Sequence, residues 1–127
     1  MKNRTGQPRV MTVILHGLGV TAMTLLGGLP SLAHASPESI AAGEQVASDR
    51  KLGNCYSCHM VVGAELAGNA GPPLIQMKSR YPDRAVLRAQ IADPRSRNPN
   101  TIMPPYGAHN ILTEQQLDQL VDYVLSL

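Results

Sequence analysis

The sequence predicts a small all-α domain, and three observations indicate it. Apolar residues recur at helical spacing towards the C-terminus, and several segments begin with residues that cap helices well. No segment alternates between apolar and polar residues, so no sheet of consequence is expected. The chain has 127 residues, which allows one domain and little more. It contains four Tyr but no Phe or Trp, so something other than aromatic rings must supply bulk to the core.

Residues 1–35 have the features of an export signal. A basic start precedes an almost uncharged stretch from 10 to 29, and Ala33-His34-Ala35 follows. This order is typical of a secretory signal peptide, cleaved here after Ala35, so a periplasmic protein is expected. An uncleaved membrane anchor is the alternative, because about 20 apolar residues can span a bilayer. Cleavage is favoured, since small residues rather than a charge cluster follow the apolar stretch.

Cleavage would leave residues 36–127 as a domain whose charges nearly balance. The full chain has 11 Lys and Arg against 9 Asp and Glu, a formal net charge of +2. Removing Lys2, Arg4 and Arg9 leaves 8 against 9, a net charge of −1. This balance argues against nucleic acid as a partner. A hydrophobic core alone is marginal at this size, so a covalent or metal staple is expected.

The first predicted helix runs from about Pro37 to Arg50. Ser36 caps it, and Pro37 occupies the first helical position. Gly43 lies on its apolar face, where glycine is unfavourable for a helix. We therefore expect another element to approach the helix closely at Gly43.

The middle of the chain is expected to hold only short elements, because Gly and Pro interrupt it repeatedly. The predicted elements are a helical turn from Asn54 to Met60, a loop from Val61 to Pro73, a short helix from Leu74 to Arg80, a helix from Arg84 to Ala92 capped by Asp83, and an irregular segment from Pro94 to Asn110.

The clearest element is the last helix, predicted from Glu114 to Ser126. Thr113 and Gln116 have the spacing of a capping box. Apolar residues then recur every three or four positions, at Leu117, Leu120, Val121, Val124 and Leu125.

The motif that carries chemistry is Cys55-Tyr56-Ser57-Cys58-His59, a C-x-x-C-H sequence typical of c-type haem attachment. Residues three and four apart share one face of a helical turn. Both thiols can therefore reach the two vinyl groups of one haem, while His59 ligates the iron. A thioredoxin-like redox pair, half of a zinc site and a plain disulfide are the alternatives. The first lacks a strand–helix context, and the second lacks further ligands.

A second axial ligand is expected from the later part of the chain. Met103 is favoured, because the prolines that follow make a stiff loop able to press a thioether onto iron. Met77 is better explained as core filler, and His109 as an exposed loop residue. The other ring nitrogen of His59 needs an acceptor, for which the Pro72 carbonyl is the candidate and a simple turn the alternative.

These motifs resemble the class I cytochromes c, whose features include an early C-x-x-C-H, a later Gly-Pro-x-Leu, a late Met-Pro and a terminal amphipathic helix. Within that group the chain is most similar to the SoxX family of sulfur-oxidation cytochromes. The stretches that carry this similarity lie between Leu52 and Leu127: GNCYSCH, GNAGPPLIQMKSRYPD, LRAQIADP, RNPNTIMPPYGAHNILT and LDQLVDYV.

The resemblance implies a class I cytochrome c domain over residues 36–127. It implies one covalent haem c attached to Cys55 and Cys58, with His59 and Met103 as iron ligands. Gly43 and Tyr123 look like the glycine–aromatic pair where the first and last helices cross.

The resemblance also implies an enzyme complex. SoxX pairs with the cytochrome SoxA in an L-cysteine S-thiosulfotransferase. That complex joins thiosulfate to a cysteine of the carrier SoxYZ and passes two electrons to a small acceptor cytochrome c. The residues alone agree with an electron-transfer role, because residues 36–127 show no nucleophile with its base and no catalytic residue is assigned.

Three alternative functions remain open at the level of sequence. The chain could be a free electron-shuttling cytochrome c, or the haem subunit of another periplasmic dehydrogenase. A thiol–disulfide oxidoreductase is the third.

A basic cluster could contact haem propionates or an acidic partner, or form a solvated face balanced by Asp83 and Asp93. Its members are Lys78, Arg80, Arg84, Arg88, Arg95 and Arg97.

Overall fold

The computed structural model describes residues 35–127, and the predicted signal peptide lies outside this part except for Ala35. Within these residues every regular element is helical, which confirms the all-α prediction. No helix among them is long and apolar enough to cross a membrane. The elements are α1 (Pro37–Ser48), a 3₁₀ turn (Cys55–Ser57), α2 (Met77–Arg80), α3 (Arg84–Ala92), a second 3₁₀ turn (Pro94–Ser96) and α4 (Glu114–Ser126).

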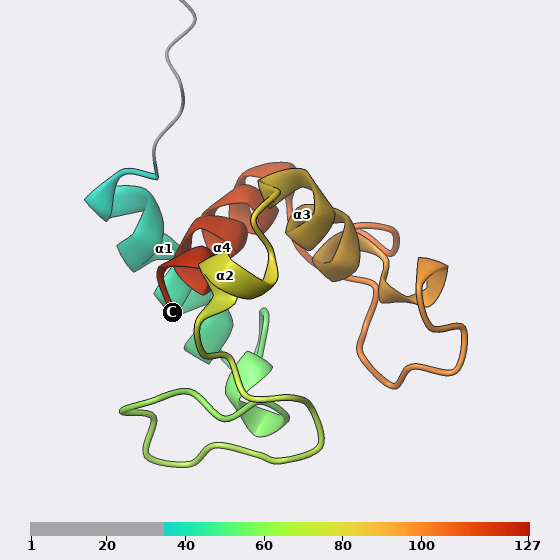
Figure 1. Ribbon diagram of the computed structural model, residues 1–127, viewed down its shortest axis with the longest axis horizontal. Coiled ribbons are helices and arrows are strands. Elements are labelled where there is room, and N and C mark those ends of the chain that lie inside the picture. The colour runs from blue at the N-terminus through green and yellow to red at the C-terminus, as the bar shows by residue number, and fades with distance from the viewer. Residues whose placement is uncertain (1–34) are drawn as a thin grey trace, which may run out of the picture. The chain divides into compact units, whose positions relative to one another are not determined.

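Helix α4 is the centre of the fold and contacts α1, α2 and α3 (Figure 1). Its capping box forms as predicted: Thr113 Oγ1 accepts from the Gln116 amide at 3.2 Å, and the Thr113 amide donates to Gln116 Oε1 at 2.9 Å. The predicted apolar face is buried, and Leu117, Leu120 and Val121 are at most 1% exposed. Burial of this face against three other helices holds the domain together.

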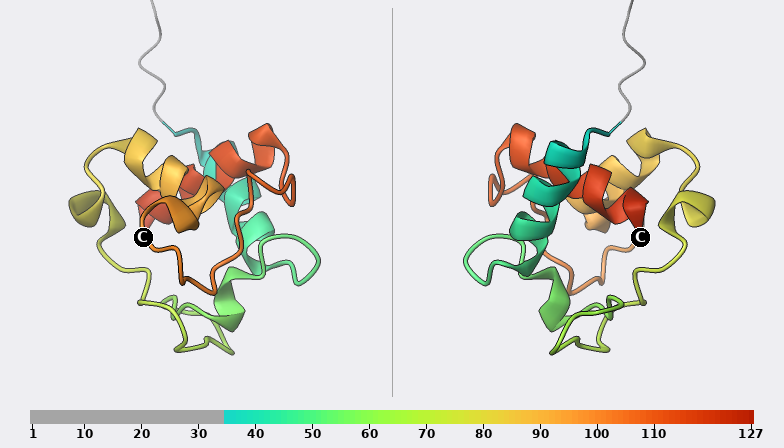
Figure 2. Two further views of the ribbon diagram at one scale, coloured as in Figure 1. Left: turned by 90° about the vertical axis from the view of Figure 1, so that its right-hand side faces the viewer. Right: turned by 90° about the vertical axis from the view of Figure 1, so that its left-hand side faces the viewer.

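Helices α1 and α4 cross in close contact, as Figure 2 shows from two sides. Gly43 lies at the crossing, as its unfavourable position in a helix predicted. A Cβ atom there would be 2.0 Å from the Gln119 carbonyl oxygen and 2.7 Å from Tyr123 Cβ. Only glycine lets the two backbones approach this closely, so the expected pairing of Gly43 with Tyr123 is confirmed.

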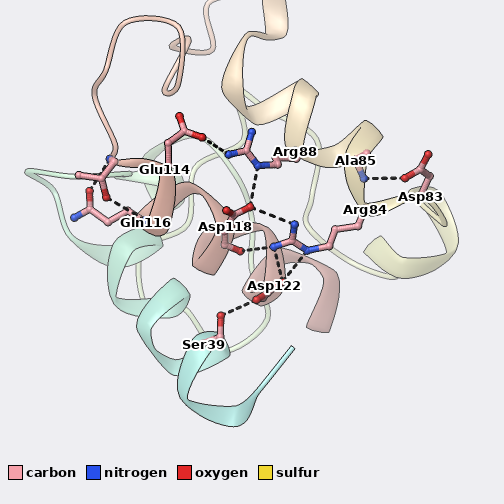
Figure 3. Close-up of polar contacts among 10 residues, drawn as sticks. Ser39, Asp83, Arg84, Ala85, Arg88, Glu114, Gln116, Asp118 and Asp122 are labelled. Carbon is pink, nitrogen blue, oxygen red and sulfur yellow. Dashed lines mark hydrogen bonds and ion pairs between the residues drawn. The ribbon is translucent and has the colours of Figure 1, made fainter. Parts of the chain in front are cut away.

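Arginines of α3 bind the acidic face of α4 (Figure 3). Arg88 Nε donates to Asp118 Oδ1 at 2.8 Å, and Arg84 Nε donates to Asp122 Oδ1 at 2.9 Å. Ser39 Oγ of α1 donates to the other oxygen of Asp122 at 2.6 Å, so this network joins three helices. Two members of the basic cluster therefore hold the fold together. The acidic partners of Arg84 and Arg88 lie on α4, whereas the sequence suggested Asp83 and Asp93 as the balancing acids.

Three predicted boundaries were too generous, each for a visible reason. Helix α1 ends at Ser48 rather than near Arg50, because Asp49 has an extended backbone. The turn after it covers only Cys55–Ser57, since Asn54 has a positive φ of 47°. Helix α2 begins at Met77 rather than Leu74, because Gln76 has a φ of 51° and its amide donates to the Leu127 carbonyl. A short 3₁₀ turn, Pro94–Ser96, also lies within the segment expected to be irregular.

Candidate haem site

The C-x-x-C-H motif forms one helical turn, as its spacing predicted. The amides of Cys58 and His59 both donate to the Cys55 carbonyl, at 3.1 and 2.9 Å. Ser57 Oγ closes the turn by donating to the Asn54 carbonyl at 2.6 Å. The turn therefore holds the two thiols and the imidazole in a fixed relation to one another.

The loop after the motif is bound to this turn by backbone hydrogen bonds. The amides of Gly68, Gly71 and Leu74 donate to the carbonyls of Tyr56, Cys58 and Met60, at 2.7, 2.8 and 2.9 Å respectively. Through these bonds the loop between the motif and Leu74, which has no regular structure, contacts the attachment turn again. They bring the Pro72-Pro73 segment beside His59.

The His59 ring is held on two sides by this loop. Its Nδ1 lies 2.7 Å from the Pro72 carbonyl oxygen, which confirms Pro72 as the acceptor and leaves Nε2 free of that bond. Gly71 lies against the ring, and a Cβ there would be 2.5–2.9 Å from three ring atoms. The imidazole thus has a fixed orientation, and residue 71 must lack a side chain to permit it.

A cavity of about 430 Å³ opens beside this turn, within the size range of cofactor sites. Its apolar walls come from buried residues of the helices, including Leu87, Ile91, Leu120 and Val124. Its lining also contains Cys55, Cys58, His59 and Met103, the four residues predicted for the site. These lining residues fit haem c, which would supply the bulk that the core lacks in aromatic side chains.

The three candidates for the second axial position differ in their surroundings. Met103 lines the cavity from the loop after α3 and is partly buried. Met77 also lines the cavity, but it is 3% exposed within the core and its sulfur accepts a hydrogen bond from Arg80 at 3.3 Å. His109 is exposed, and its Nε2 lies 3.2 Å from Arg95. This geometry favours Met103, because the other two side chains already have partners.

Burial affects the acidity of one of the two thiols, that of Cys55. Burial raises the pKa of the Cys55 thiol to about 11, so it is protonated at neutral pH. Cysteines of redox pairs instead have lowered pKa values, because the thiolate is their nucleophile. No disulfide joins Cys55 to Cys58. The raised pKa of Cys55 does not favour thiol–disulfide exchange at this pair.

One contact at this site was missed from the sequence. The Tyr106 hydroxyl donates a buried hydrogen bond to the carbonyl of Gly53, two residues before Cys55. Tyr106 is 7% exposed and lines the cavity. The only signal available was a tyrosine close after Met103 in a chain poor in aromatics, which did not indicate its partner.

Comparisons with known proteins agree with this geometry. The cytochrome c family profile matches residues 40–127. A chain in the crystal structure of SoxXA from P. pantotrophus is similar in structure, with a TM-score of 0.62 and 25% identity over 74% of this chain and 82% of that one. This likeness supports the resemblance to SoxX-type cytochromes.

An uncharacterized lipoprotein of Aquifex aeolicus (strain VF5) is 33% identical over 75 residues. That match covers 58% of this chain, and the chain spans only 36% of the length of the relative. The family match covers the attachment turn, the cavity and α4 together, and the cofactor of such a domain is one covalently attached haem c. The chain belongs to the cytochrome c family.

Proposed function

We propose that this chain is the monohaem electron-transfer subunit of a periplasmic thiosulfate-oxidising complex of the SoxAX type. In this proposal Cys55 and Cys58 attach the haem through thioethers, while His59 and Met103 bind the iron. The observation that carries it is that all four side chains line one apolar cavity, although Met103 lies 44 residues after His59 along the sequence.

When bound, the haem supplies one-electron transfer at its iron. The residues of the chain orient the ligand side chains and form the cavity around the haem. The Pro72 carbonyl fixes the tautomer and orientation of His59, and Gly71 gives the imidazole its space. The apolar helix residues around the cavity would limit access of water to the bound haem. A methionine and a histidine as iron ligands would give a higher reduction potential than two histidines, so the chain would be suited to accept electrons from a partner of lower potential.

If His59 and Met103 both bound the iron, no position on it would remain for a substrate. We therefore place bond formation on a partner, a SoxA-type cytochrome that conjugates thiosulfate to the cysteine of a SoxYZ-type carrier. This chain then receives the released electrons and passes them to a small acceptor cytochrome c. Within an L-cysteine S-thiosulfotransferase it is the subunit without a substrate site. The likeness to a chain of SoxXA supports this assignment.

Export is part of the proposal, since attachment of haem c and a partner of this kind require it. We place the mature protein in the periplasm, with the signal peptide cleaved after Ala35. The mass of the purified protein tests both points, because cleavage removes residues 1–35 and covalent haem adds its own mass. A protein that retained the apolar stretch would instead be a membrane-anchored cytochrome.

Affinity purification of the native protein tests the complex. The proposal expects a stable heterodimer with a second c-type cytochrome, and thiosulfate-dependent reduction of the haem only when that partner and the carrier are present. Recovery of a monomeric haem protein alone would favour a free electron shuttle. Recovery with an unrelated dehydrogenase would favour the other alternative.

A further inference from the structure

The loop that carries Met103 is held loosely along its length. Among the described residues, the hydrogen bonds of 99–104 stay within the loop, and all are 3.1 Å long. The Thr101 amide donates to the Asn98 carbonyl, the Asn100 amide to Asn98 Oδ1, and the Met103 amide to Thr101 Oγ1. Ile102, next to Met103, is 80% exposed. Nothing in the loop itself therefore fixes the position of Met103 relative to the attachment turn.

The first buried side chain after Met103 is that of Tyr106. Its carbonyl accepts from the amides of Ile111 and Leu112, at 2.9 and 3.1 Å, and its side chain is buried. The next two amides, of Gly107 and Ala108, both donate to the Ala92 carbonyl at 3.0 Å. Tyr106 therefore lies where the loose loop rejoins the rigid part of the domain.

The hydroxyl of Tyr106 connects this point to the other side of the cavity. It donates to the carbonyl of Gly53, and the Gly53 amide donates to the Val46 carbonyl at the end of α1. Gly53 is itself tightly placed, because a Cβ there would be 2.6 Å from that Val46 oxygen and 3.1 Å from Cys55 Sγ. One hydrogen bond thus links the Met103 loop to the start of the turn that carries both thiols.

We infer that Tyr106 is a positioning residue for the axial methionine, and that its hydrogen bond to Gly53 keeps Met103 over the attachment turn. This inference rests on the proposed ligand pair. A ligand that replaces Met103 on the iron must displace the loop, and this displacement would break the Tyr106–Gly53 hydrogen bond. A neutral buried hydrogen bond is worth about 1 kcal/mol, so its loss should raise the open population about fivefold.

The experiment is a titration of the oxidised holoprotein with imidazole, a small external ligand for haem iron. Loss of the weak sulfur-to-iron charge-transfer band reports displacement of methionine. Tyr106→Phe should bind imidazole about fivefold more tightly than the wild type. The matched control is Ser39→Ala, which removes a hydroxyl hydrogen bond of 2.6 Å to Asp122 between α1 and α4, away from the cavity and the Met103 loop. The control should change imidazole affinity by less than about twofold.

Denaturant unfolding of the same two variants separates positioning from general weakening. The inference is contradicted if Tyr106→Phe binds imidazole like the wild type, or if both variants gain affinity equally for a similar loss of stability. Met103→Ala serves as a separate control. If that variant kept the charge-transfer band, the ligand proposal would fail whatever the outcome at Tyr106.

A measurement on the wild type covers the case in which Tyr106→Phe does not fold. Amide hydrogen exchange is compared with and without saturating imidazole. The amides of Ile111 and Leu112, which donate to the Tyr106 carbonyl, should exchange faster when imidazole is bound. The Gly71 amide, which donates to the Cys58 carbonyl, should not change. Unchanged exchange at Ile111 and Leu112 would contradict the inference.

Discussion

The helices and the two cavity loops of this domain are held by different means. Helices α1, α3 and α4 are joined by a buried apolar face, a tight crossing at Gly43 and a network of ion pairs. The loops that carry Pro72 and Met103 have no regular structure and depend on a few single hydrogen bonds. From this comparison we expect that the stability of the fold and the geometry of the proposed iron site can be changed separately. Changes in the helices should alter unfolding, while changes in the loops should alter the haem spectrum first.

The largest expected effect is at the helix crossing. Gly43→Ala places a methyl group 2.0 Å from the Gln119 carbonyl, so α1 and α4 must separate. We expect a loss of about 3 kcal/mol in the free energy of unfolding, measured with guanidinium on the holoprotein. The folded variant should keep its methionine band. Ala41→Leu, on the exposed side of the same helix, should cost less than about 0.5 kcal/mol. Equal losses in the two variants would refute the role given to the crossing.

A smaller loss of stability but a larger spectral change is expected in the loop that carries Gly71 and Pro72. Gly71→Ala places a methyl group 2.5–2.9 Å from the His59 ring, which must turn away from the Pro72 carbonyl. We expect the absorption spectrum of the iron site to change, with a loss of about 1–2 kcal/mol in stability. Gly43→Ala is the control, since it should show the reverse pattern. An unchanged spectrum in Gly71→Ala would show that the ring orientation does not matter.

The smallest effect concerns the ion pairs between α3 and α4, and it depends on pH. Burial alone would raise the pKa of Asp118, but hydrogen bonds from Arg88 and Arg84 bring it below its ordinary value of 3.8. Because the pKa is lower in the folded state, this carboxylate stabilises the fold above about pH 4, and the effect is lost as the pH falls through the lowered pKa.

Asp118→Asn tests this dependence. Asp118 is 46% exposed, so screening by water limits the expected cost to less than about 1 kcal/mol near neutral pH. The difference from the wild type should shrink at about pH 3, measured by denaturant unfolding at both pH values. Glu65→Gln, in the exposed loop, is the control and should show no such pattern. A difference that persisted at low pH would mean that Asp118 acts through packing rather than charge.

Most of the helices could be predicted from the sequence, because the interactions that form them join residues close together along the chain. The capping box at Thr113 and the apolar spacing of α4 involve residues three or four apart, and both were confirmed. Gly43 was readable as a point of close approach because glycine is unfavourable inside a helix. The misjudged helix ends depend on single backbone angles, such as the positive φ of Gln76, which composition does not reveal.

The site could be predicted only in part, because some of its contacts join residues far apart in the sequence. In the short C-x-x-C-H motif, the spacing determines how the side chains lie relative to one another. Pro72 follows the motif closely enough to be named as the acceptor for His59. The Tyr106–Gly53 bond joins residues 53 apart, and the acids that bind Arg84 and Arg88 lie 38 and 30 residues further along. Such pairs are set by how the helices pack, so the sequence indicated the two arginines without their acceptors and did not single out Tyr106.

The most direct test of the central claim is the absorption spectrum of the oxidised, purified protein and two of its variants. The account predicts a Soret peak that persists under denaturing conditions, together with a weak sulfur-to-iron charge-transfer band. That band should be lost in Met103→Ala and kept in Met77→Ala. A protein without a Soret peak, or a band that depended on Met77 rather than Met103, would contradict it.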